Sequence, residues 1–259
     1  AGDLRREKGL SMLAIIGGSG FAQLPGFELE RREVARTPYG EPSSALSFGK
    51  IGGSAVMLLA RHGYGHTIPP HEINYRANIW ALHSSGVKKV VGLATVGGIR
   101  ADLAPGVIMV PDQIIDYTYG RSGTFFTVQD RGVHHVDFTL PYSQALRLAL
   151  IEAGKHSAEP LVDGGVYAAT QGPRLETAAE INRLERDGAD IVGMTGMPEA
   201  VLAREIGLEY AALAIVVNHA AGRGASGTGI AMTEIAAVMQ QSAGRVQKIL
   251  EKLAAHHGG

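Results

Sequence analysis

Four short segments combine small residues with hydroxyl, guanidinium or imidazole groups, the residue types that bind oxyanions. The segment GGSG at 17–20 offers unhindered backbone N–H groups and one hydroxyl. Arg61 and His62 stand together after an apolar run, and this pair favours an anionic ligand. Thr95 follows an apolar run and lies shortly before the pair Gly97-Gly98, and Thr195 lies just ahead of a predicted helix, whose N-terminus attracts anions. Each segment alone is also typical of a plain turn or cap, but together they predict one phosphate-sized site.

Two other ligand classes fit these residues less well. The segment GGSG resembles half of a dinucleotide-binding fingerprint, but the third glycine would fall at Gln23, and no acidic residue clearly follows a second strand at the required distance. His62, His66 and His71 are close in sequence, yet their spacing matches neither a helical i, i+4 pair nor a zinc pattern. We therefore predict no metal and expect His66 and His71 to be structural.

Apolar runs and helical spacing alternate along the chain, which predicts an α/β domain built from βαβ units. Strands are expected at 13–16, 56–60, 89–94, 107–110, 165–170, 189–192 and 210–217, and helices at about 74–82, 143–153, 177–186, 198–206 and from 233. Residues 28–60 look antiparallel, with Gly52-Gly53 as a hairpin turn. Such sheets bind ligands at the carboxyl ends of their strands, where the anion-binding segments should meet.

The composition excludes several classes of protein. The chain has 259 residues, 45% hydrophobic and 19% charged, so it can bury the core of one sizeable domain. A formal net charge of −1 argues against nucleic acid as a partner. No cysteine is present and no apolar run approaches the ~20 residues of a membrane span, so we expect a cytoplasmic protein with no membrane partner. Residues 1–11 precede Met12 and are expected to be a leader or an extension, with a single domain at 12–259.

Four longer segments make the sequence similar to a known family. TPYGEPSSAL, RHGYGHTIPPHEINYRANIWAL, TQGPRLET and GMTGMPEAVLARE resemble the trimeric purine-nucleoside phosphorylase and methylthioadenosine phosphorylase family, from Met12 to the C-terminal helix. The resemblance implies an α/β fold with a central mixed β-sheet flanked by helices, inorganic phosphate as co-substrate, no cofactor and a homotrimer. It assigns Met194 to the ribose, and it gives the phosphate to the residues found above, namely Ser19, Arg61, His62, Thr95 and Thr195.

The expected base pocket departs from the methylthioadenosine branch of that family. In that branch two aspartates flank an aromatic residue near the end of a strand, where this chain has Asn218, His219 and Ala220. An Asn amide can donate to purine N7 and to a 6-oxo oxygen, and the carboxylate missing at Ala220 removes an acceptor for a 6-amino group. Glu176 matches the carboxylate of 6-oxopurine phosphorylases and can accept the N1 proton of hypoxanthine, whereas adenine has a lone pair there. The alternative is that Glu176 is only a first-turn acid of the following helix.

Three residues are assigned to the 5' end of the sugar. His135 matches a pocket histidine of the methylthio branch, and Met232 and Ile235 give the last helix an apolar start. Together with the 6-oxopurine pocket, they predict cleavage of 5'-methylthioinosine by phosphate to hypoxanthine and 5-methylthioribose 1-phosphate. Asn218 would be catalytic by donating to N7 as the purine leaves, and His62 by helping to neutralise the phosphate.

Other functions stay open at this point. Within the family, the alternatives are an inosine or guanosine phosphorylase and a methylthioadenosine phosphorylase. Outside it, a nucleoside hydrolase would use water with the same base pocket, and a non-catalytic nucleoside-binding protein would need only the glycine turns. A non-catalytic nucleoside-binding protein does not explain why anion-binding side chains should gather at one edge of the sheet.

Overall fold

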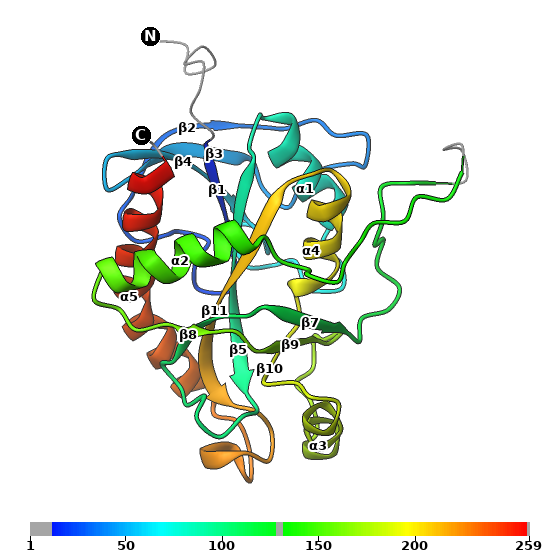
Figure 1. Cartoon of the computed structure of the whole chain (residues 1–259), viewed down its shortest axis with the longest axis vertical. Helices are drawn as coiled ribbons and strands as arrows, with labels where there is room; N and C mark the ends of the chain where they lie inside the picture. Colours follow the sequence, from blue (N-terminus) through cyan, green and yellow to red (C-terminus); the bar gives the residue numbers. More distant parts are fainter. Residues whose placement is uncertain (1–11, 128–131, 258–259) are drawn as a thin grey trace.

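The computed structural model describes residues 12–127 and 132–257, and the expected leader, residues 1–11, lies outside the described residues. Strands and helices alternate through most of these ranges (Figure 1). The strands are β1 (Leu13–Gly17), β2 (Phe27–Glu33), β3 (Leu46–Ile51), β4 (Ser54–Ala60), β5 (Lys89–Gly98), β6 (Ile108–Val110), β7 (Gln113–Asp116), β8 (Val162–Asp163), β9 (Val166–Ala169), β10 (Ile191–Gly193) and β11 (Glu209–His219). The helices are α1 (Tyr75–Ser84), α2 (Gln144–His156), α3 (Ala178–Arg186), α4 (Gly196–Glu205), the short 3₁₀ helix η2 (Gly224–Ser226) and α5 (Met232–His257).

The strands of the described ranges join in one mixed sheet of eleven strands. Its main path runs β2-β3-β4-β1-β5-β10-β9-β7, and β11 pairs with β5 and β6 beside this path. β1 lies parallel to β4 and β5, whereas β3 is antiparallel to both β2 and β4 and meets β4 at the predicted Gly52-Gly53 turn. The predicted α/β fold with a central mixed β-sheet flanked by helices is confirmed.

Alternating side chains of the central strands fill two cores, one on each face of the sheet. Leu13 and Ile15 of β1 pack on the face covered by α2 and α5, while Ala14 and Ile16 pack on the face covered by α1 and α4 (Figure 1). These four side chains are almost completely buried. A parallel strand covered on both faces requires such a continuous apolar run. The strand ends are thereby held in place, and the polar residues that follow them can form a rigid site.

The structure differs from the predicted elements in the length or presence of a few strands. The sequence pattern predicts neither β7 nor β8, because strands of four and two residues are too short to show a periodicity. β5 continues past its predicted end at Ala94 to Gly98, since this part of the strand pairs with β11. β11 in turn extends to His219, so Asn218 belongs to the strand and not to the loop after it.

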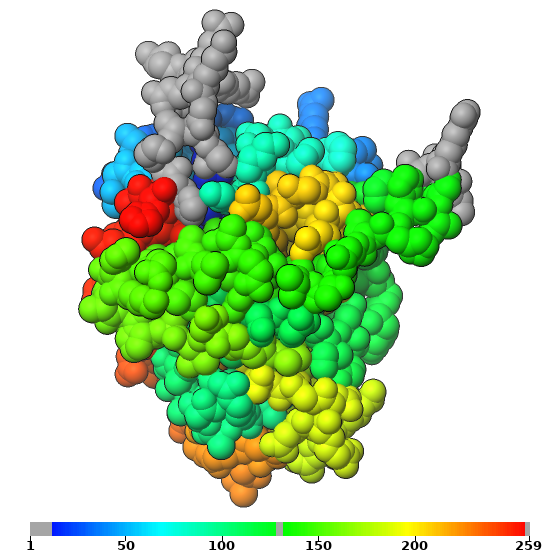
Figure 2. Space-filling model, in the orientation of Figure 1, coloured from blue at the N-terminus to red at the C-terminus, as the bar shows by residue number. Residues whose placement is uncertain are grey.

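The connection between β7 and α2 contains no helix or strand over its described residues, 117–127 and 132–143. It runs outward from the body of the molecule and returns to the start of α2 (Figures 1 and 2). Phe125 anchors part of it by packing against Tyr39, whereas Tyr119 and Val133 are exposed. We call this segment the projecting connection, and it carries both Arg121 and His135.

Candidate active site

The ends of the central strands surround a cavity of about 610 Å³. Its walls come from the turn after β1, the ends of β4, β5, β10 and β11, the segment before α3, and the start of α5. This is the strand edge at which the sequence predicts a ligand. Ten of the predicted site residues line it, namely Ser19, Arg61, His62, Thr95, Glu176, Met194, Thr195, Asn218, Met232 and Ile235.

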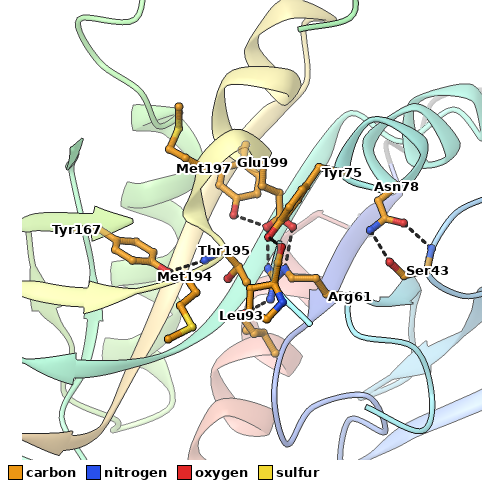
Figure 3. A network of polar contacts seen from close by, with 12 residues as sticks. Ser43, Arg61, Tyr75, Asn78, Leu93, Tyr167, Met194, Thr195, Met197 and Glu199 are labelled. Carbon is orange, nitrogen blue, oxygen red and sulfur yellow. Dashed lines mark hydrogen bonds and ion pairs between the residues drawn. The ribbon is translucent and has the colours of Figure 1, made fainter. Parts of the chain in front are cut away.

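The groups predicted to bind an oxyanion lie together in this cavity. Thr195 is the N-cap residue of α4, its side chain makes no capping hydrogen bond, and its backbone N–H donates to the Tyr167 hydroxyl at 3.3 Å (Figure 3). The GGSG turn approaches Arg61 closely, since a Cβ atom at Gly18 would lie 2.8 Å from Arg61 Nη1. Hydroxyls, backbone N–H groups and a guanidinium therefore line one cavity, as an oxyanion site requires.

Arg61 is buried, with 1% of its surface exposed, and its charge is paired. Its Nε and Nη2 donate to the two carboxylate oxygens of Glu199 at 2.8 and 2.7 Å, and its Nη1 donates to the Leu93 carbonyl at 2.7 Å (Figure 3). Burial disfavours the charge on Arg61, but the attraction of Glu199 and its hydrogen bonds outweigh burial, so the pKa of Arg61 is raised. Nη1 and Nη2 each keep one further N–H for a ligand.

His62 is an uncharged acceptor in this site. Its Nδ1 lies 2.8 Å from the Ile68 carbonyl, which can only accept, so Nδ1 carries the proton and Nε2 keeps a lone pair. Burial, followed by the charge of Arg61, lowers the pKa of His62 from 6.5 to about 4. This corrects the expectation that His62 adds positive charge. An uncharged imidazole suits the P–OH group of hydrogen phosphate instead, because that group can donate to the free ring nitrogen.

Glu176 lines the cavity from the segment between β9 and α3. Its Oε1 accepts a hydrogen bond from the Thr170 hydroxyl at 2.7 Å, which orients the carboxylate and leaves Oε2 for a ligand. The alternative role as a first-turn acid of α3 is wrong, because Thr177 caps that helix and Glu180 completes the capping box. The geometry leaves Glu176 able to accept a ring N–H, as a 6-oxopurine requires.

A β-bulge precedes the expected base-binding residues at the end of β11. The pairing of β11 with β5 shifts between Val216 and Asn218, and such a bulge re-aims the side chains around it. Asn218 lines the cavity, while His219 lines a neighbouring hollow and packs against Gly224. Asn218 Nδ2 donates to the His219 carbonyl at 2.6 Å, so one N–H of this amide remains for a purine. Donation to N7 and a 6-oxo oxygen at once, as expected from the sequence, would require breaking this bond.

Apolar side chains line the part of the cavity formed by α5. Met232 and Ile235 lie there as predicted, and Met239, which no sequence motif indicates, follows one helical turn later. Met239 also contacts the GGSG turn, because its Sδ lies 3.2 Å from the place of a Cβ atom at Gly20. His135 is exposed and does not line the cavity of its own chain, so its assignment to the 5' pocket stays a prediction from motif similarity. The projecting connection carries it away from the strand ends.

Some residues of the site have no clear signal in the sequence. Glu199 stands 138 positions from Arg61, and the two meet only because α4 packs beside the end of β4. Thr170 directly follows β9. The rule that ligands bind at the carboxyl ends of strands, which indicates Thr95, could therefore have indicated Thr170 as well. His66, expected to be structural, lines the cavity with its ring centre 4.7 Å from that of His62.

Residues 12–127 and 132–257 also bear on two other expectations, metal binding and membrane insertion. Over these ranges no group of three or more histidine, cysteine or acidic side chains is arranged to hold a metal ion. His71 instead lies 3.7 Å from the Glu72 carboxylate at the surface. None of the helices in the described part of the chain is both long enough and apolar enough to cross a membrane.

The chain belongs to the Phosphorylase superfamily, whose family model matches residues 12–255. It is 50% identical over 244 residues to the probable S-methyl-5'-thioinosine phosphorylase of Pseudomonas syringae pv. tomato, an alignment that covers 94% of this chain and 98% of that protein. It is 44% identical over 243 residues to the 6-oxopurine nucleoside phosphorylase of Pyrococcus furiosus, an alignment that covers 92% of this chain and 90% of that protein.

Solved structures agree with this family. The methylthioadenosine phosphorylase of Schistosoma mansoni in complex with adenine superposes with a TM-score of 0.89 at 34% identity, covering 95% of this chain and 91% of that one. The resemblance found in the sequence is confirmed, and the chain is an enzyme.

Proposed function

We propose that this enzyme cleaves a 6-oxopurine nucleoside by phosphorolysis, with 5'-methylthioinosine as the preferred substrate. The observation that carries the proposal is that three kinds of wall line one cavity. They match the phosphate, the purine base and the 5' group of the sugar. The phosphate wall consists of Ser19, Arg61, His62, Thr95 and Thr195, the base wall of Glu176, Asn218 and Ala220, and the apolar wall of Met232, Ile235 and Met239. Met194 lines the same cavity and is assigned to the ribose.

The base wall favours hypoxanthine over adenine. Glu176 keeps one carboxylate oxygen to accept N1–H, and Asn218 keeps one N–H to donate to the purine. Ala220 is 1% exposed, and its side chain supplies no acceptor for a 6-amino group. Adenine would place the lone pair of N1 against the carboxylate, and polar sites of this kind can discriminate by ~10⁴-fold.

Phosphate would attack C1' of the ribose as the glycosidic bond loosens. A phosphate oxygen forms a bond to C1' while the bond from C1' to N9 breaks, with inversion at that carbon through an oxocarbenium-like transition state. Arg61 already shares its charge with Glu199, so the phosphate keeps much of its own charge to stabilise the developing cation. The leaving purine gains negative charge, which the hydrogen bond from Asn218 to N7 would offset.

The apolar wall supports a methylthio group over a 5'-hydroxyl. Met232, Ile235 and Met239 can bury a methyl and a thioether, and each buried methylene-sized group contributes about 0.8 kcal/mol. A hydroxyl at the same place would lose hydrogen bonds to water without a polar partner on this wall. The relative from Pseudomonas syringae is named for methylthioinosine and that from Pyrococcus furiosus for 6-oxopurine nucleosides, which supports the same combination.

One assay with parallel substrates tests the proposal. Purified enzyme is given methylthioinosine, methylthioadenosine or inosine, each with and without phosphate, and the free base is measured. We expect methylthioinosine with phosphate to give the highest kcat/KM. If methylthioadenosine were cleaved as well as methylthioinosine, the assignment of the base wall would be overturned. If inosine were cleaved as well as methylthioinosine, the assignment of the apolar wall would be overturned. Cleavage that does not need phosphate would make the enzyme a nucleoside hydrolase, and binding by calorimetry without turnover would make it a nucleoside-binding protein.

We further infer a cytoplasmic homotrimer that needs no cofactor or metal and has neither nucleic acid nor membrane as a partner. The trimer rests on the family resemblance, and the cytoplasm on the complete absence of cysteine. Light scattering should give the mass of three chains, and a monomer or dimer would contradict it. Full activity after dialysis against a chelator is expected, and its loss would show that a metal is needed.

A further inference from the structure

Arg121 lies on the projecting connection, yet its guanidinium enters the body between the segments that follow β9 and β10. Its Nη1 donates to the carbonyls of Met194 and Met197, both at 2.7 Å. Its Nη2 donates to the Gln171 carbonyl at 2.8 Å and contacts the Thr170 carbonyl at 3.4 Å. One side chain therefore joins two backbone segments that are distant in sequence.

Both segments carry walls of the cavity. Thr170 holds the Glu176 carboxylate at 2.7 Å, so the segment after β9 belongs to the base wall. Met194 directly precedes Thr195, and both line the cavity on the side assigned to ribose and phosphate. The two segments also pack against each other, because a side chain at Gly172 would overlap the sulfur of Met194.

Arg121 is held by uncharged groups. Besides the four carbonyls, its Nη1 lies 3.1 Å from the Tyr75 hydroxyl oxygen, which can share one of its N–H groups, and the guanidinium lies 5.3 Å from the centre of the Tyr75 ring. Its Nε is buried without a hydrogen-bond partner, which costs free energy and is tolerated only where other contacts fix the group. A planar guanidinium presents donors in several fixed directions, whereas a lysine ammonium is a single point. The acceptors around Arg121 lie in several directions, which suits a guanidinium better than an ammonium.

We propose that Arg121 is a positioning residue that sets the spacing between Glu176 and the Met194–Thr195 segment and thereby controls selection of the base. This inference rests on the proposed function, because Glu176 can select only a purine that lies against it. Without the guanidinium, the carbonyls of Gln171 and Met194 lose their common donor and the two walls can move apart. A displacement of about 1 Å in such a site can cost ~10²-fold in rate.

A simpler role for Arg121 is to anchor the projecting connection to the body. The two roles differ in one measurable quantity, the ratio of kcat/KM for methylthioinosine to that for methylthioadenosine. This ratio does not depend on how much of the enzyme is folded, so an anchoring role leaves it unchanged. A positioning role changes it, because Glu176 no longer meets N1 at the correct distance.

The experiment compares Arg121→Ala and Arg121→Lys with Arg183→Met in the full chain. Arg183 is a matched control, since its guanidinium also stacks on a tyrosine, 5.4 Å from the Tyr117 ring centre, but pairs with Asp187 at the surface of α3. Both substrates are assayed at saturating phosphate, and free guanidinium ion is added to Arg121→Ala at concentrations that leave the wild type folded.

We expect Arg121→Ala to lower kcat/KM for methylthioinosine by ~10²-fold and the selectivity ratio by about tenfold or more. Arg121→Lys should stay impaired, guanidinium should restore part of both quantities in Arg121→Ala, and Arg183→Met should match the wild type. An unchanged ratio in both Arg121 variants would overturn the proposal and leave only anchoring. Should Arg121→Ala fail to fold, the ratio in Arg121→Lys decides. A wild type without any preference between the two nucleosides would instead refute the assigned substrate.

Discussion

Arg61 and Glu199 form a bidentate ion pair in which neither side chain has more than 1% of its surface exposed. Tyr210 donates to the same carboxylate at 2.7 Å, and a side chain at Gly92 would overlap the Tyr210 hydroxyl. The pair thus fixes the guanidinium of Arg61 at the cavity wall while removing most of its net charge. An orienting but nearly neutral site suits the proposed reaction, in which phosphate would first bind and then attack as a nucleophile.

The first prediction concerns the stability that this pair confers. Glu199→Gln removes the carboxylate and leaves a buried guanidinium without its counter-charge, which typically costs about 3–5 kcal/mol. Urea unfolding of wild type and variant measures this loss. Glu159→Gln is the control, because Glu159 also pairs with two cations, Arg245 and Lys248, whose side chains are 29% and 60% exposed. We expect a clearly smaller loss there, and equal losses in the two variants would contradict the argument from burial.

The sequence predicts which polar side chains line the cavity but not the contacts that hold them in place. Ser19 and Thr95 follow places where an apolar run stops in the sequence, and Thr195 precedes a helix, although β5 in the structure continues through Thr95 to Gly98. Glu199 shows no such signal, since it lies inside a helix and meets Arg61 only through long-range packing. The charge state of His62 depends equally on tertiary structure, because burial and the neighbouring guanidinium set it together.

The residues proposed to contact the base, Glu176 and Asn218, also depend on contacts that the sequence does not reveal. Motif similarity identifies Glu176 and Asn218, but the hydrogen bond from Thr170 that orients Glu176 and the bulge that precedes Asn218 appear only once β9, β5 and β11 are paired. For His135, motif similarity and the position in the structure differ. Motif similarity assigns it to the pocket, although the connection that carries it leaves the body of its own chain.

The second prediction is a dependence of stability on pH that comes from His62. The pKa of His62 is 6.5 in an exposed chain and about 4 in the fold, so between these values the unfolded chain binds a proton that the folded chain does not. Stability should therefore fall as the pH is lowered from about 6.5 toward 4. His62→Gln cannot titrate at this position and should lose less free energy of unfolding between pH values inside that window. Parallel losses in wild type and variant would show that His62 is not the group responsible.

The third prediction tests the acceptor in the base wall. Glu176→Gln keeps the size of the side chain but can turn an N–H toward N1, which adenine accepts and hypoxanthine does not. The preference for methylthioinosine over methylthioadenosine should fall by ~10²-fold or more, as expected when a site loses a specific polar partner. The measurement is the ratio of the two kcat/KM values. Glu180→Gln on the neighbouring helix removes a carboxylate that belongs to the capping box and does not line the cavity, so its ratio should stay at the wild-type value. A preserved ratio in Glu176→Gln would exclude this carboxylate from base selection.

The fourth prediction separates binding from catalysis at Asn218. Its amide keeps one N–H for the purine while the other is held by the His219 carbonyl at 2.6 Å, so the donor is already oriented before the substrate arrives. Such a preorganised donor stabilises the charge on N7 only as the glycosidic bond breaks, and its loss typically lowers kcat by ~10²-fold or more. Asn218→Ala should therefore reduce kcat at saturating methylthioinosine and phosphate, with a smaller change in KM for the nucleoside. Single-turnover measurements show whether the chemical step or product release has slowed. If kcat stays at the wild-type value while KM rises, Asn218 only binds the base, and the leaving group must be stabilised by another part of the cavity.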